Sequence, residues 1–128
     1  MYSILIFEDD RERIKWFKRE FVGHEIQITQ SVQGAIELLC NQDFDLILLD
    51  NDIVLEHYEN PDCYDGTGRE LADWLAQTKL NNSPVILIHS CNSVASQYMY
   101  DVLVTMYTTV KKSFAELQQK GIECAIKL

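Results

Sequence analysis

The 128-residue sequence has few prolines and glycines, no closely spaced cysteine pair and no long apolar run, and these absences exclude several classes of protein. Its four cysteines are scattered without a Cys-x-x-Cys pair, which argues against a zinc knuckle or a thiol redox motif. No apolar run approaches the roughly 18 to 20 residues that span a bilayer, and the first apolar stretch is too short for a signal peptide. We therefore expect a soluble, cytoplasmic protein with free thiols and no membrane partner.

Basic residues are also scarce, since 11 lysines and arginines face 20 acidic residues and the net charge is −9. Nonspecific binding to DNA depends on basic patches, so this balance opposes it. A small phosphorylated ligand remains compatible with the acidic balance if a metal ion cancels the local negative charge.

What the sequence does contain is a set of short apolar runs that end abruptly in polar residues. With 47% hydrophobic residues and no repeat or low-complexity segment, it predicts a single domain over residues 1–128. Polar side chains follow each of three runs, which are Ile4 to Phe7, Leu46 to Leu49 and Val85 to Ile88. Such runs are typical of buried parallel strands, whose carboxyl ends form the rim where ligands bind. We expect the three groups of polar residues to converge there.

The rest of the chain alternates strand and helix patterns, which predicts an α/β fold with right-handed crossovers and helices on both faces of a parallel sheet. His24 to Thr29 alternates polar and apolar residues like an edge strand. From Ala95 to Leu117 the apolar residues keep helical spacing, with a bend or break expected near Thr108 and Thr109, and the last strand is expected at Ile122 to Lys127. The methionines and aromatic residues of this helical region could be core or a surface for a protein partner or a homodimer.

Three consecutive acids follow the first strand, and we expect Asp9 and Asp10 among them to have a metal-related role. One of the two can cap the following helix. Adjacent carboxylates repel each other and gain most when a divalent cation lies between them, so capping alone does not account for the pair. Asp50 and Asp52 follow the central strand.

Two further groups of residues are candidates for binding phosphate or transferring a proton. Thr67 has the spacing of a capping box with Glu70, but Thr67 and Gly68 could instead contact a phosphate at the start of their helix. His89 ends the fourth strand, where an imidazole can pass a proton to a leaving oxygen near neutral pH.

The acids after strand one, the acid ending strand three and the Asp65 and Gly66 turn before a helix resemble the receiver domains of two-component signalling. That resemblance implies a flavodoxin-like, doubly wound, five-stranded parallel sheet of order 2-1-3-4-5. It also implies Mg²⁺ binding and a phosphoryl group accepted by Asp50. The chain departs from receivers after strand four, and it has no secure counterpart of their lysine at the end of strand five, which Lys111 and Lys112 imitate only weakly.

The chain is more similar to the cyclic-phosphate processing receiver domains. It shares with them the acids after strand one, an Asp-x-Asp ending strand three, a Thr-Gly opening a helix and a His-Ser-x-Asn after strand four. It departs at Asn51, where the group usually has histidine. The matching positions are Asp9, Asp10, Asp50, Asp52, Thr67, Gly68, His89, Ser90 and Asn92.

This resemblance implies metal-assisted hydrolysis of a cyclic phosphate ester, with a cyclic nucleotide or an RNA 2',3'-cyclic phosphate end as ligand. Asp9, Asp10 and Asp50 would bind Mg²⁺ or Mn²⁺. The catalytic residues would be His89, Asp50 and Asp52. The phosphate would be bound by Ser90, Asn92, Thr67 and Gly68. The alternatives are a receiver module phosphorylated on Asp50 and a degenerate receiver that only binds another protein.

Overall fold

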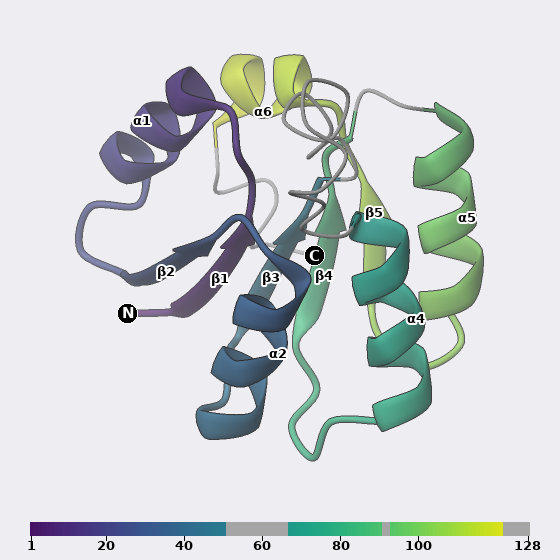
Figure 1. The fold of residues 1–128 in the computed structure, drawn as a ribbon. Coiled ribbons are helices and arrows are strands. Elements are labelled where there is room, and N and C mark those ends of the chain that lie inside the picture. Colours follow the sequence, from purple (N-terminus) through teal and green to yellow (C-terminus); the bar gives the residue numbers. More distant parts are fainter. Residues whose placement is uncertain (51–66, 91–92, 122–128) are drawn as a thin grey trace, which may run out of the picture.

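The computed structural model describes residues 1–50, 67–90 and 93–121, and these ranges form a five-stranded parallel sheet covered by helices on both faces (Figure 1). The strands are β1 Ser3–Phe7, β2 Glu25–Thr29, β3 Leu46–Leu49, β4 Val85–Ile88 and β5 Thr109–Lys111. The helices are α1 Arg11–Glu20, α2 Val32–Asn41, α4 Gly68–Thr78, α5 Ser93–Leu103 and α6 Phe114–Lys120. The strand order β2-β1-β3-β4-β5 confirms the predicted topology.

Alternate residues of the central strands enter two separate hydrophobic clusters, one on each face of the sheet. Leu5, Ile47 and Ile86 lie in the cluster packed under α2, α4 and α5. Their neighbours Ile6 and Leu48 lie in the cluster that includes residues of α1 and α6. This period of two means that the residue just beyond each strand end also belongs to a definite face.

The carboxyl-terminal region differs from the sequence prediction, because a strand interrupts the long helical stretch expected from Ala95 to Leu117. Helix α5 ends at Leu103, and β5 occupies Thr109–Lys111. The buried Tyr107 fixes the turn between them: its hydroxyl donates to the Leu75 carbonyl at 2.8 Å and accepts from the Leu80 N–H at 3.1 Å. The β-branched residues that follow favour an extended strand.

The expected last strand at Ile122 to Lys127 was therefore a wrong assignment for the fifth strand of the sheet, which is Thr109–Lys111. Residues 122–127 lie outside the described ranges. In the part of the chain that the structure describes, no helix combines the length and the apolar composition that crossing a membrane requires.

Candidate functional site

Glu8, Asp50 and His89 form one row across the carboxyl edge of the sheet, each one residue beyond the end of its strand. Phe7 pairs with Leu49, which in turn pairs with Ile88, so the next residue on each strand lies in register. The backbone ladder continues through this row, since Asp50 N–H donates to the Phe7 carbonyl and His89 N–H to the Leu49 carbonyl. Three distant parts of the sequence are thus brought together.

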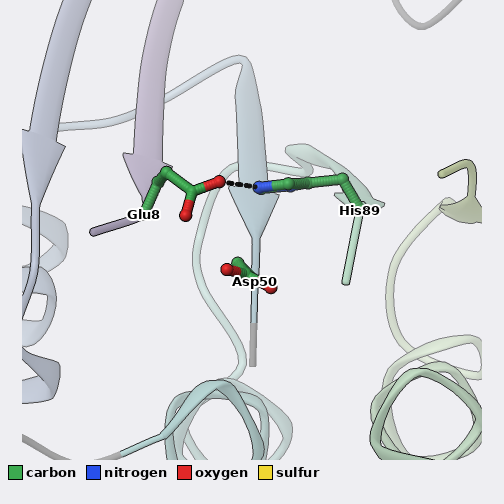
Figure 2. A group of neighbouring side chains, drawn as sticks. All are labelled: Glu8, Asp50 and His89. Atoms are coloured by element: carbon green, nitrogen blue, oxygen red, sulfur yellow. Dashed lines mark hydrogen bonds and ion pairs between the residues drawn. The ribbon is translucent and has the colours of Figure 1, made fainter. Parts of the chain in front are cut away.

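The three side chains are buried and contact one another directly. Their exposed fractions are 0% for Glu8, 1% for Asp50 and 0% for His89. Glu8 Oε1 lies 3.0 Å from His89 Nε2, and one potential metal-binding atom from each of the three residues lies within 4.8 Å of the others. Figure 2 shows the Glu8 carboxylate pointing at the imidazole, with Asp50 entering from the strand between them.

Glu8 is held in its ionised form by the groups around it. Its Oε2 accepts hydrogen bonds from the backbone N–H groups of Asp9 at 3.1 Å and Asp10 at 3.2 Å. Burial raises the pKa of Glu8, but the hydrogen bond and charge of His89, with contributions from the neighbouring Asp50 side chain and the Asp10 backbone N–H, outweigh it and lower this pKa below its ordinary value. An ionised Glu8 places a proton on Nε2 of His89.

The other ring nitrogen of His89 has a different environment. Nδ1 is buried and has no hydrogen-bond partner among the residues that the structure describes. The ring itself packs edge-on against Phe17 of α1, with the ring centroids 5.4 Å apart. The imidazole is therefore fixed in orientation by Glu8 and Phe17, while one nitrogen is left for a ligand or a proton.

Arg13, on the first turn of α1, adds a cation to this cluster. Its Nη1 lies 3.6 Å from Glu8 Oε1 and 3.8 Å from Asp50 Oδ2. The guanidinium also lies over the ring of Phe114 in α6, 5.0 Å from the centroid. A single guanidinium thus neutralises part of the charge of two carboxylates from different strands.

The structure separates the two acids that the sequence presents as a pair. Asp10 is exposed and caps α1, because its Oδ1 accepts from the Arg13 backbone N–H at 3.0 Å. Asp9 is half-buried at the rim. The acid that lies beside Asp50 and His89 is Glu8, which sequence reasoning did not select.

The predicted phosphate-binding residues are placed only in part. Thr67 caps α4, since its Oγ1 accepts from the Glu70 N–H at 3.4 Å, so the capping alternative is present. Gly68 is the buried first residue of that helix, and Ser90 is half-buried directly after His89. Asp52 and Asn92 lie outside the described residues, and the role of all five in binding or catalysis stays a prediction.

Lys112 occupies the same row as the buried cluster, on the far side of His89. Ile88 pairs with Lys111, and the Lys112 N–H donates to the Ile88 carbonyl at 3.0 Å, so Lys112 lies in register with His89. Lys111 instead contacts α5, where its Nζ donates to Gln97 Oε1 at 2.6 Å. Both lysines lie within the stretch that the apolar spacing predicted to be helical, and the β-branched run before them was the available signal for a strand.

Solved structures of receiver domains share this fold. A CheY-like receiver domain from Methanospirillum hungatei is 19% identical with a TM-score of 0.65, covering 98% of this chain and 94% of that one. The receiver domain of a LuxO repressor protein from Vibrio parahaemolyticus is 18% identical, with a TM-score of 0.65 and coverage of 98% and 90%. The response regulator TrrA from Thermotoga maritima, in complex with Mg²⁺ and BeF, is 20% identical, with a TM-score of 0.64 and coverage of 98% and 99%.

Comparison with curated protein sequences gives no match. The sequence model of the cyclic-phosphate processing receiver domain matches residues 4–105, a range that includes Glu8, Asp50 and His89. The match spans most of the chain and agrees with the receiver topology of the sheet. The chain therefore belongs to the cyclic-phosphate processing receiver domain family.

Proposed function

We propose that this protein is a metal-dependent enzyme that hydrolyses a cyclic phosphate ester on a nucleotide or an RNA end. The observation that supports it most is the buried cluster of Glu8, Asp50 and His89 in a chain of this family. Two carboxylates suffice to attract a divalent cation, whereas a histidine fixed beside them adds a group that transfers protons near neutral pH.

The donor atoms of the cluster fit Mg²⁺ or Mn²⁺. Glu8 and Asp50 provide carboxylate oxygens, and Asp9, half-buried at the rim, could provide another. Asp10 is less suited, because its Oδ1 accepts the helix-capping hydrogen bond. The chemistry supplied by such an ion is polarisation of the phosphoryl group and activation of water.

His89 would act as the general acid. Hydrolysis forms one P–O bond to water and breaks the P–O bond to a ribose oxygen, which needs a proton as it leaves. Glu8 holds Nε2 of His89 at 3.0 Å, so an imidazolium protonated on both nitrogens would deliver that proton from Nδ1 and keep its Nε2–H on Glu8. Ser90, Asn92, Thr67 and Gly68 remain the proposed phosphate contacts, and Asp52 a proposed catalytic residue.

A screen of phosphate esters tests this function. Purified protein with Mg²⁺ or Mn²⁺ is offered 2',3'-cyclic nucleotides, 3',5'-cyclic nucleotides and linear monophosphates. Loss of a general acid typically costs about 10²- to 10⁴-fold in rate, and we expect this loss in His89→Gln. His24→Gln is the matched control, since His24 lies at the opposite end of the sheet and accepts a hydrogen bond from the Tyr2 N–H.

The outcomes of the screen separate the roles of the residues. If His89→Gln still turns over a cyclic ester, His89 only forms a hydrogen bond with Glu8. Its assignment as the general acid would then be wrong. Turnover that persists in Asp50→Asn would remove the metal site from the mechanism. Unfolding curves of each variant show whether a loss of activity merely follows a loss of folded protein.

A phosphoacceptor module is a second candidate, favoured by the placement of Lys112. Asp50 ends β3, and Lys112 lies in the same register row beyond β5, which is the pairing of acid and lysine expected of a receiver. Incubation with acetyl phosphate and Mg²⁺ should then add one phosphate, as measured by mass spectrometry. The added mass should be absent from Asp50→Ala; its presence there would exclude Asp50 as the acceptor.

A further inference from the structure

Arg13 lies at the entrance of the buried cluster rather than inside it. Its side chain is 21% exposed, whereas the side chains of its partners Glu8 and Asp50 are 0% and 2% exposed. The two ion-pair distances of 3.6 and 3.8 Å are longer than the 2.7 to 3.2 Å typical of direct N–H···O hydrogen bonds. The guanidinium thus neutralises part of the charge of both carboxylates at N–O distances longer than those of a direct hydrogen bond.

An aromatic support holds the guanidinium at this entrance. Phe114 lies beneath it at 5.0 Å and packs against Trp16 and Phe17 of α1, with ring centroids 5.1 and 5.7 Å apart. Attraction between a cation and an aromatic face favours this position even when the carboxylates no longer need a counter-ion.

A divalent cation bound to Glu8 and Asp50 would compete with Arg13 for the same oxygens. Two cations a few ångströms apart repel each other, so a metal ion would weaken the ion pairs of the guanidinium. A phosphate ester in turn has to approach carboxylates that repel it. A planar guanidinium suits this approach because its N–H groups match two phosphate oxygens at once.

We propose that Arg13 is the resident cation of this site: it neutralises Glu8 and Asp50 in the metal-free protein, and it binds a phosphate oxygen once a metal ion has taken its place. This assignment rests on the metal-binding part of the proposed function. It makes Arg13 a phosphate-binding residue that also lowers the affinity of the site for metal.

The test measures metal binding without turnover. Arg13→Met removes the charge but keeps an unbranched apolar side chain against Phe114, and Mn²⁺ binding is followed by the electron paramagnetic resonance signal of the free ion. We expect Kd for Mn²⁺ to fall about tenfold, because a competing cation has been removed. Lys15→Met is the control: Lys15 is on the same helix, is 66% exposed and pairs with the exposed Glu12.

The second measurement uses inorganic phosphate on protein saturated with Mn²⁺. Arg13→Met should bind phosphate about tenfold more weakly than the wild type, because a charge-assisted contact to phosphate has been lost. The two effects have opposite directions, tighter metal and weaker phosphate. A general loss of structure would weaken both, so it cannot produce this pattern.

Each half of the assignment can be overturned separately. Unchanged or weaker Mn²⁺ binding in Arg13→Met, or unchanged phosphate binding, contradicts it. Phe114→Leu provides a second variant, in which Arg13 keeps its charge but loses its support, and a smaller fall in Kd for Mn²⁺ is expected. A wild-type protein that binds no divalent metal would instead contradict the proposed function itself.

Discussion

The two ends of the parallel sheet use polar side chains in different ways. At the amino end, polar side chains bind backbone groups next to the strands. Asp45 Oδ2 accepts from the Ser3 N–H at 2.8 Å, and Asn82 Nδ2 donates to the Phe44 carbonyl at 2.7 Å. His24 Nδ1 accepts from the Tyr2 N–H at 2.9 Å. Each contact satisfies a backbone group that would otherwise depend on water.

At the carboxyl end, charged side chains contact one another instead. Glu8 contacts His89, and Arg13 lies near both carboxylates. Glu8, Asp50 and His89 are buried, although burying charged groups is costly unless they are paired. The polar side chains of the amino end therefore satisfy backbone groups, whereas those of the carboxyl end bury titratable groups against one another and depend on their mutual pairing.

Removing one acid from each end of the sheet should give the largest difference in stability between the two ends. Glu8→Ala leaves His89 buried without its partner and leaves the N–H groups of Asp9 and Asp10 without their acceptor, so we expect a loss of about 3 to 5 kcal/mol. Asp45→Ala removes one exposed hydrogen bond and should cost about 1 kcal/mol.

Urea-induced unfolding with a chelator present measures both values. If Glu8→Ala loses no more stability than Asp45→Ala, the carboxylates of the cluster repel each other in the metal-free protein more than His89 and Arg13 attract them. That result would mean that charge repulsion at the carboxyl end outweighs the stabilisation from its ion pairs and hydrogen bonds.

Metal binding gives the next largest difference between the two ends. A divalent cation at about 100 times its Kd should stabilise the wild type by about 2.7 kcal/mol, because it binds only the folded state. Asp50→Asn should lose this stabilisation, and Asp45→Asn should keep it. Thermal unfolding with Mn²⁺ or with a chelator measures the shift; a shift retained in Asp50→Asn would place the metal elsewhere.

The same contrast shows which parts of the molecule could be predicted from sequence. β1, β3 and β4 are continuous apolar runs followed by polar residues, so their existence and their convergence at one rim were predictable. The strand β5 was not, because it has three residues, none of them buried, between apolar residues at helical spacing. A short partly exposed strand leaves almost no periodic signal.

At the site, Asp50 and His89 were predictable, whereas the choice among the acids after β1 was not. Moving a strand end by one residue transfers a side chain to the other face of the sheet. Only the register of Phe7 with Leu49 places Glu8, rather than the adjacent Asp9, in line with Asp50. Arg13 enters the cluster from a helix, and its contacts depend on how α1 packs.

The pH dependence of stability gives the smallest expected effect, and this effect is specific to Glu8. The pKa of Glu8 is lowered from its ordinary value of 4.5 in the folded protein, since His89, the neighbouring Asp50 side chain and the Asp10 backbone N–H outweigh burial. At pH values between the folded pKa and 4.5, Glu8 binds more protons in the unfolded chain than in the folded protein. The ionised Glu8 therefore stabilises the fold above about pH 4.5. This contribution is lost as the pH falls through the folded pKa.

The comparison of the wild type with Glu8→Gln isolates this contribution. With a chelator present, the wild type should be the more stable protein near pH 7, and the difference should shrink as the pH falls below 4.5, by at most about 1.4 kcal/mol per pH unit. Urea unfolding at several pH values measures it. A difference that stays constant down to about pH 3 would mean that folding does not lower the pKa of Glu8, and that its contacts with His89 do not favour the ionised carboxylate.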